Sequence, residues 1–351
     1  MMKSKDNVKD NAKDNIKVEA ESNQKRLYYQ LKKNVDLSNL PQIKGFDFGK
    51  KLNIKEFLKA YSTSGIQASN LGAAIEITKT MVREKVPIFL SFTSNMVSSG
   101  MREIIAYLVK NKKVAVLCTS CGGVEEDAIK ALMPFYVGNF EASGRQLLES
   151  GVGRIGNIYT TNEHYSQFEP FIREVFEKLL EEQKKDKQPI TPTKICWMMG
   201  RLIKEKKEYD EKDSYLYWAY EKNIPVYCPG IVDGAIGDIC YFFRKTHPDF
   251  VIDVMADHVK LIDYVLNTEK TGAIILGGGI AKHYVLNANI FKDGLDYSVY
   301  ISTATPYDAS DSGGNQEEAI TWAKVRPNAL RVKVHCDASI AFPLLVAGSF
   351  V

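Results

Sequence analysis

The sequence lacks long hydrophobic runs, and no apolar stretch approaches the roughly 18 residues that a membrane-spanning helix needs. Charged residues recur every few positions in the opening MMKSKDNVKD, where a signal peptide would have an apolar segment. An excess of one charge sign is also missing, because 46 basic residues face 43 acidic ones and the net charge is +3. Such a balance gives no overall field to attract nucleic acid or an anionic membrane. We therefore expect a cytoplasmic protein that binds neither.

Cysteine is scarce, with six in 351 residues, and only Cys118 and Cys121 form a CxxC pair. No second pair stands at metal-ligand spacing, and the preceding VAVL indicates that Cys118 lies in a buried strand. We therefore predict buried free thiols in a reducing compartment, and no metal site.

Short apolar strands alternate with amphipathic helices from Phe46 onward. Spacing of apolar residues every three to four positions predicts helices at 54–61, 71–82 and 99–110. The predicted strands are PIFLSFTS, VAVLCTS, RIGNIYT, IPVYCPG, GAIILGG, YSVYIST and LRVKVHCD. This alternation predicts an α/β fold: a Rossmann-like, doubly wound, mostly parallel sheet with helices on both faces.

Two segments depart from this rhythm. The first carries a repeat, KDNV-KDNA-KDNI, whose small apolar residues bury too little surface to order it. We therefore predict a disordered tail over residues 1–25 and a single domain over 26–351, although a helix that docks on a neighbouring subunit would also suit the repeat. The second, residues 179–213, is rich in charge and proline, and we predict a helix followed by a solvated excursion.

Glycine or small polar residues follow several of the predicted strands, as in FTSNMVSSG, TSCGGVEED, GGGIAKH and STATPYD. In doubly wound sheets, ligands bind at the carboxyl ends of the strands, where glycine lets the backbone approach a phosphate. The GxGxxG fingerprint is absent, and each such strand end could be an ordinary turn. A dinucleotide fits these strand ends, but the local pattern alone leaves a nucleotide site and ordinary turns equally open.

The segment Asp311–Lys324, DSGGNQEEAITWAK, combines carboxylates, a glycine turn, a tryptophan and one lysine. Carboxylates bind ammonium groups, an indole face covers a cation, and a neutral lysine amine can form an imine with an oxidised amine. The segment therefore suits a polyamine. His283 follows the GGGIAK turn, and Asn287, four residues on, would share its helix face and pocket.

The spacing within this segment raises a geometric question. Glu318 and Trp322 share a face of a regular helix, but Lys324 lies about 120° from Glu318. Either the substrate wraps around the helix end or the helix ends before Lys324. Pro327 disfavours helix at Arg326 and so supports an early end.

The same segment resembles the active-site segment of the deoxyhypusine synthase family. The resemblance runs from about Leu40 to Val351, through SFTSNMVSSGMRE, CGGVEED, GRIGN, DGAIGD, ILGGGIAKHYVLNAN, YDASDSG and CDASIAFPLLVA. It implies an NAD-dependent transferase that moves the aminobutyl group of spermidine to one lysine of the hypusine-bearing translation factor precursor. It also makes residues 26–351 an NAD-binding catalytic domain and implies a homotetramer with active sites shared between paired subunits.

The resemblance also assigns residues. It implies Lys324 as the imine-forming lysine and His283 as a proton relay, with spermidine held by Glu126, Asp238, Asn287, Asp311, Glu318 and Trp322. Asp238 could instead be a helix N-cap. NAD would be held by Ser94, Asn95, Ser98, Ser120, Gly122, Glu125, Asp233, Gly278, Gly279, Thr303, Ala304, Asp308, Asp337 and Ala338. This chain has TSCGG at 119–123, where the family commonly has TTAGG.

Two other functions remain open from the sequence. A homospermidine synthase-like enzyme would need the same lysine, cofactor and amine site but would use putrescine as the acceptor. A regulatory paralogue would activate a catalytic partner chain without turning over itself. Intact Lys324, His283 and Asp311 count against this second alternative.

Overall fold

The computed structural model describes residues 16–20 and 36–351. Residues from Lys44 to Val351 form one compact unit. Of the predicted disordered tail, only residues 16–20 are described, and they are helical. The rest of that prediction, including most of the KDN repeat, lies outside the described residues.

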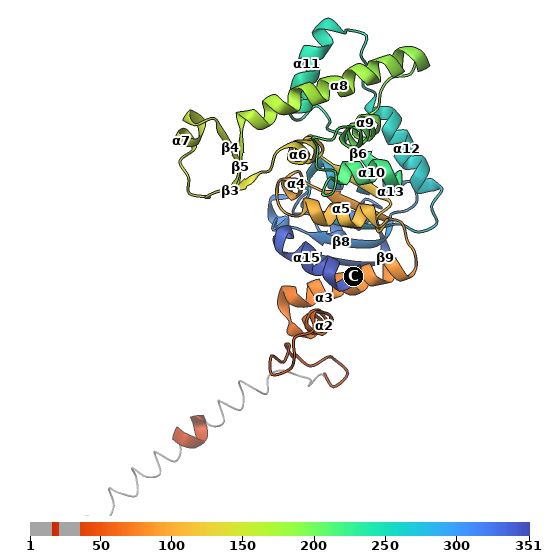
Figure 1. Cartoon of the computed structure of the whole chain (residues 1–351). Helices are drawn as coiled ribbons and strands as arrows, with labels where there is room; N and C mark the ends of the chain where they lie inside the picture. Colours follow the sequence, from red (N-terminus) through yellow and green to blue (C-terminus); the bar gives the residue numbers. More distant parts are fainter. Residues whose placement is uncertain (1–15, 21–35) are drawn as a thin grey trace, which may run out of the picture. The chain divides into compact units, whose positions relative to one another are not determined.

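A six-stranded sheet forms the centre of the compact unit (Figure 1). Its strands, in chain order, are β1 (Ile88–Phe92), β2 (Val116–Thr119), β6 (Val226–Tyr227), β7 (Gly272–Leu276), β8 (Leu295–Ile301) and β9 (Val325–Val334). Every neighbouring pair is parallel, in the order β6-β2-β1-β7-β8-β9. Counted along the chain within this sheet, the order is 3-2-1-4-5-6, that of a dinucleotide-binding fold. The predicted fold class is confirmed.

Helices cover both faces of this sheet. One face shares a buried core with residues of α2 (Ile54–Ser64), α3 (Ile66–Arg83), α4 (Asn95–Ser98), α5 (Arg102–Lys110), α6 (Cys121–Leu132), α8 (Asn162–Asp186), α9 (Pro192–Glu205), α10 (Tyr215–Lys222), α11 (Ala235–Thr246) and α15 (Ala338–Ser349), of which α2, α8 and α11 pack against other helices. The other packs against α12 (Val254–Leu266), α13 (Gly279–Ile290) and α14 (Gln316–Thr321). A short 3₁₀ turn, η1 (Pro306–Asp308), follows β8.

The central strands alternate between the two cores that these helices create. In β1, Leu90 and Phe92 belong to the first core, whereas Phe89 belongs to the second. In the neighbouring β7, Ile274 belongs to the first core and Ile275 to the second. Because both sides of these strands are buried, their sequences are almost continuously apolar, which is how they could be predicted.

RIGNIYT does not join the parallel sheet, so that prediction is wrong. It forms β4 (Val152–Ile155) and β5 (Ile158–Thr161), which pair antiparallel and lie in a separate sheet of order β3-β5-β4, with β3 at Tyr136–Val137. Two residues, Gly156 and Asn157, join β4 to β5, and Gly156 has a φ of +59°. A two-residue turn of this kind makes a hairpin, because the chain has no length for a crossover to a parallel partner. The strands of this sheet and the adjacent α7 (Gly144–Glu149) are drawn together in Figure 1.

The segment 179–213 is also more ordered than predicted. The end of α8 is the predicted helix, but α9 follows it, begins at the N-cap Thr191 and has proline at its first position. Its residues Ile195, Met199 and Leu202 recur at helical spacing and are at most 1% exposed. Helix α9 therefore divides the expected solvated excursion into two short linkers, residues 187–189 and 206–213, and the charged residues of α9 occupy its outer face.

All six cysteines are free thiols, and five of them are buried. Burial raises the pKa of both Cys118 and Cys121 well above the usual range, so this CxxC pair is held as neutral thiols. In the part of the chain that the structure describes, no helix has the length and apolar character that crossing a membrane requires.

Candidate active site

The residues expected to hold a dinucleotide follow the strands of the parallel sheet. Because all six strands are parallel, their carboxyl ends meet at one edge of the sheet. The chain leaves β1 toward β2 on one side and leaves β7 toward β8 on the other, so the switch point of the fold lies between β1 and β7. The segments at this point are 94–98 and 277–279. The sequence prediction and the topology therefore indicate the same position.

The turn after β7 depends on glycine. Gly277 and Gly279 have φ values of +85° and +64°, in the left-handed region that only glycine adopts at little cost. A Cβ atom added at Gly279 would meet no atom within 4 Å, so this backbone borders open space. A Cβ at Gly278 would instead clash with Ser312. The turn therefore exposes main chain toward a ligand and also abuts the segment that begins at Asp311.

Two buried carboxyls stand in α6, directly behind the end of β2. Glu125 accepts a hydrogen bond from the Ile236 amide at 3.0 Å, and burial raises its pKa. Glu126 accepts a hydrogen bond from the Ser98 hydroxyl, and burial raises its pKa to about 7. Ser98 was expected to bind cofactor and Glu126 substrate, so the structure brings one residue of each set into contact.

The raised pKa of Glu126 predicts a pH-dependent stability. Between its ordinary value of 4.5 and about 7, the folded chain keeps a proton that the unfolded chain releases, so the free energy of unfolding should fall as pH rises. Glu126→Gln removes this dependence. We expect it to match the original chain near pH 5 and to be more stable by roughly 2 to 3 kcal/mol at pH 8. Urea unfolding of both chains at pH 5 and at pH 8 measures this difference in the free energy of unfolding.

The exposed Glu177 on α8 supplies the control for this measurement. Glu177→Gln should leave the difference in unfolding free energy between pH 5 and pH 8 unchanged. A Glu126→Gln variant that lost stability at pH 8 would mean that Glu126 is ionised and stabilising in the fold, contrary to our interpretation.

A cavity of about 540 Å³ lies between α13, the loop after β8 and α14. It brings together six of the residues expected at the amine site, from segments up to 41 positions apart: His283, Asn287, Asp311, Glu318, Trp322 and Lys324. Asn287 lies one helical turn after His283 on α13, as predicted from the sequence.

The chain reverses just before Lys324, which answers the geometric question posed by the sequence. Helix α14 ends at Thr321, Trp322 is its C-cap, and Ala323 has a left-handed φ of +54°. That conformation costs an L-residue about 1 kcal/mol or more. It lets the Lys324 amide donate back to the Ala319 carbonyl at 2.9 Å. The helix therefore ends early, and the turn rather than the helix face brings Lys324 into the cavity.

Three side chains form a relay in this cavity. The Lys324 Nζ lies 3.1 Å from His283 Nε2, and His283 Nδ1 lies 3.4 Å from an Asp311 carboxylate oxygen. The carboxylate favours the tautomer that carries its proton on Nδ1, which leaves Nε2 free to accept a proton from Lys324. The arrangement suits a lysine that must become neutral before it attacks an electrophile.

The cavity also has the polarity that a cationic ligand needs. The second carboxylate oxygen of Asp311 is buried and accepts no hydrogen bond from the described residues. A buried carboxylate oxygen without a partner is costly, and an ammonium group of a ligand would satisfy it. Glu318 adds a second carboxylate, and the Trp322 indole, 65% exposed, offers an uncovered aromatic face.

Glu126 and Asp238 do not line this cavity. Asp238 lies in the first turn of α11, whose N-cap is Gly234, so Asp238 is not the cap. Its charge contributes to the raised pKa of Glu125, which indicates that it lies near Glu125. Within one chain, the acidic residues predicted for the amine site therefore form two separate groups.

Several residues of the cavity were not predicted. Leu286 and Ile290 lie three and seven positions after His283, and this spacing along α13 could have revealed them. Lys282, next to His283, is only 4% exposed, and nothing in the sequence distinguishes it from a surface lysine. Asn315 is the N-cap of α14, since its side chain accepts a hydrogen bond from the Glu318 amide.

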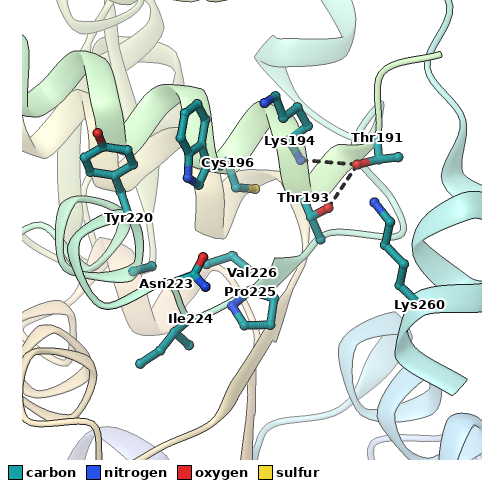
Figure 2. A pocket seen from close by; sticks show the side chains of 12 residues that line it. Thr191, Thr193, Lys194, Cys196, Tyr220, Asn223, Ile224, Pro225, Val226 and Lys260 are labelled. Carbon is teal, nitrogen blue, oxygen red and sulfur yellow. Dashed lines mark hydrogen bonds between the residues drawn. The ribbon is translucent and has the colours of Figure 1, made fainter. Parts of the chain in front are cut away.

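A second cavity, of about 370 Å³, lies beside α9, α10 and the start of β6 (Figure 2). In Figure 2, Lys260 extends toward Thr191 and Thr193 at the start of α9. The Thr193 amide already donates to Asp257 at 2.7 Å, and the Lys194 ammonium is paired with Glu182 at 2.9 Å. Both groups are thus paired within the chain, and none of the residues predicted for the active site lines this cavity.

The fold and the first cavity together define a class of protein: a doubly wound α/β protein whose cavity groups a lysine, a histidine and two carboxylates, with the strand order of a dinucleotide-binding fold. Comparisons with known proteins narrow this class. Residues 56–349 match the family model of deoxyhypusine synthase. The chain is 43% identical to the deoxyhypusine synthase of Senecio vernalis over 335 residues, covering 88% of this chain and 89% of that protein. It is 44% identical to that of Nicotiana tabacum over 344 residues, with the same coverage.

A solved structure agrees with the sequence comparisons. The crystal structure of an Entamoeba histolytica chain assigned as a deoxyhypusine synthase superposes with a TM-score of 0.62, at 27% identity, covering 88% of this chain and 96% of that one. The chain belongs to the deoxyhypusine synthase family.

Proposed function

We propose that this chain transfers the aminobutyl group of spermidine to one lysine of the hypusine-bearing translation factor precursor. The observation that carries the proposal is the 3.1 Å approach of Lys324 Nζ to His283 Nε2, in a cavity where a buried carboxylate oxygen of Asp311 has no partner among the described residues. Family membership supports it.

NAD is the cofactor that the proposal requires. The residues at the strand ends suit it: the open backbone at Gly279 would approach a pyrophosphate, and the N-termini of α6 and α13 follow β2 and β7 directly. When bound, NAD accepts a hydride from spermidine and later returns it to the product, so the overall reaction has no net redox change. Ser94, Asn95, Asp233, Thr303 and Asp308 are further candidates to hold it, and so are Ser98, Ser120, Gly122, Glu125, Gly278, Ala304, Asp337 and Ala338.

The residues of the chain carry the transfer itself. His283 takes a proton from the Lys324 ammonium, and Asp311 stabilises the imidazolium that results. The neutral amine then forms a bond to the oxidised carbon of the substrate, while the bond to 1,3-diaminopropane breaks and the leaving amine takes the proton. The acceptor lysine displaces Lys324 in the same manner. Glu318 and Trp322 hold the remaining charge and chain of the amine.

The proposal extends to the assembly and the location of the protein. We propose a homotetramer in the cytoplasm, with active sites shared between paired chains. Support comes from Glu126 and Asp238, which lie outside the cavity of their own chain. A second chain could bring these carboxylates to the amine site. The light-scattering mass of the purified chain tests the tetramer.

One assay tests the activity and its cofactor. Purified chain, labelled spermidine, NAD and the precursor protein should yield 1,3-diaminopropane and an acceptor heavier by one aminobutyl group. Omission of NAD from chain stripped of nucleotide should abolish diaminopropane release, because the substrate carbon must be oxidised before Lys324 can attack it. Release at an equal rate without nicotinamide would contradict the proposal.

The same assay separates the two alternatives. Replacing the precursor by putrescine tests the homospermidine synthase-like reaction, and homospermidine as the main product would favour it. A regulatory paralogue would give neither product when the chain is alone, but would raise the rate of a catalytic relative.

A further inference from the structure

We propose that Lys282 is a positioning residue, which fixes the loop after β8 onto α13 and so sets the distance between Asp311 and His283. Lys282 lies on α13 immediately before His283, but its side chain points away from solvent and is almost entirely buried. The inference rests on the amine site proposed above. It assigns a task to a residue that neither the sequence pattern nor the transfer mechanism uses.

The contacts of Lys282 are with the main chain of that loop. Its ammonium donates hydrogen bonds to the carbonyls of Asp311 and Gly314, the latter at 3.0 Å. It also lies 4.8 Å from the ring centre of Tyr300, on β8. A buried ammonium requires such partners, because unpaired burial is costly. The two hydrogen bonds fix the Asp311–Gly314 segment against the helix that carries His283.

A second lysine holds the same loop from the other side. Lys333, on β9, donates to the carbonyl of Ala304 at 3.1 Å and to that of Gly313. One ammonium therefore joins two points nine residues apart and closes the loop, while Lys282 docks the closed loop on α13. Burial lowers the pKa of both lysines.

The position of this loop determines the distance between Asp311 and His283. Asp311 reaches His283 across a gap between two elements that do not belong to one hairpin or helix, and the 3.4 Å separation depends on how the loop docks. With Lys282 removed, Lys333 still holds the loop at Gly313 and the Ser302 hydroxyl still donates to the Ser312 carbonyl at 3.3 Å, but the Asp311 carbonyl loses its hydrogen bond to α13 and Asp311 can shift relative to His283. Misplacement of about 1 Å in a catalytic arrangement can lower the rate on the order of 10²-fold.

The test compares Lys282→Met with Lys292→Met. Lys292 offers a matched control: it lies just beyond the same helix and also donates to two main-chain carbonyls, those of Thr268 and Glu269, but it does not line the cavity. We expect Lys282→Met to bind NAD with unchanged affinity, to raise the KM for spermidine, and to reduce borohydride trapping of the Lys324 adduct on the order of 10²-fold. Lys292→Met should give as much trapped Lys324 adduct as the original chain. Lys282→Arg, which restores donors to both carbonyls, should recover most of the trapping.

Other results would overturn the inference. If Lys282→Met gives the same amount of Lys324 adduct and the same KM for spermidine as the original chain, Lys282 does not position the relay. If Lys282→Met and Lys292→Met lose the adduct equally, the cause is a general loss of stability. Should Lys282→Met fail to fold, Lys282→Gln keeps amide donors without the charge and should lose trapping by less than about tenfold, since a retained hydrogen bond keeps the loop docked. A folded Lys282→Gln with a loss on the order of 10²-fold would mean that charge, not position, is what Lys282 supplies. An original chain that forms no adduct at all would defeat the proposed function itself.

Discussion

Lys324→Arg should abolish modification of the acceptor protein while leaving NAD and spermidine binding intact. Arginine keeps the positive charge, but its guanidinium stays protonated and cannot act as a nucleophile. Because Lys324 forms the covalent bond in the proposed mechanism, the rate should fall on the order of 10³-fold or more. Mass measurement of the acceptor, with calorimetry for the two ligands, checks both parts of this expectation.

A trapping experiment identifies the lysine directly. Borohydride with spermidine and NAD should leave an aminobutyl adduct on the tryptic peptide that contains Lys324, and none in Lys324→Arg. Lys292→Arg is the matched control, since Lys292 lies outside the cavity and should keep full activity. An adduct on Lys282 instead, or full modification by Lys324→Arg, would show that the wrong lysine was assigned.

His283→Ala should lower turnover by about 10²- to 10⁴-fold, the usual range for removal of a general base. The imidazole 3.1 Å from Lys324 Nζ takes the lysine proton in the proposed mechanism, so its loss leaves that proton to solvent. Loss of a proton to solvent becomes easier as hydroxide increases. The variant should therefore recover part of its rate as pH rises from 7 to 9.5, which a pH–rate profile measures.

The exposed His335 provides the control for this substitution. His335→Ala should retain the original rate and the original pH profile. If His283→Ala loses activity by a constant factor at every pH, His283 binds substrate but does not move the proton of Lys324.

The parallel sheet could be predicted from the sequence, and so could six of the residues that line the cavity containing Lys324. Strands such as β1 and β7 are apolar on both faces, and this signal is local. His283 and Asn287 share one helix face, so their spacing also encodes their common position. Pro327 disfavours helix, so the sequence predicts that α14 ends early. It does not predict the left-handed conformation of Ala323, which reverses the chain.

The errors have identifiable physical causes. The Gly156–Asn157 pair is a two-residue hairpin turn, whereas the β-type composition around it predicts one continuous strand. The charged flanks of α9 favour a solvated segment, although Thr191 followed by proline is a recognisable helix start. The division of the acidic residues between the cavity and the α6–α11 region depends on packing between distant segments, which spacing along one chain does not record.

The turn at Ala323 also has a consequence for the order of events in time. Lys324 is hydrogen-bonded through its own amide to Ala319 and through its carbonyl to Leu295, so its backbone is fixed at both ends and only its four methylenes move. An aminobutyl group carried on this lysine stays tethered to a single point. In the proposed mechanism the donor and the acceptor amine therefore react in succession at this one tethered carbon. If the proposed transfer is correct, we expect an acceptor lysine that enters first to block the donor, so that a large excess of acceptor protein slows the reaction.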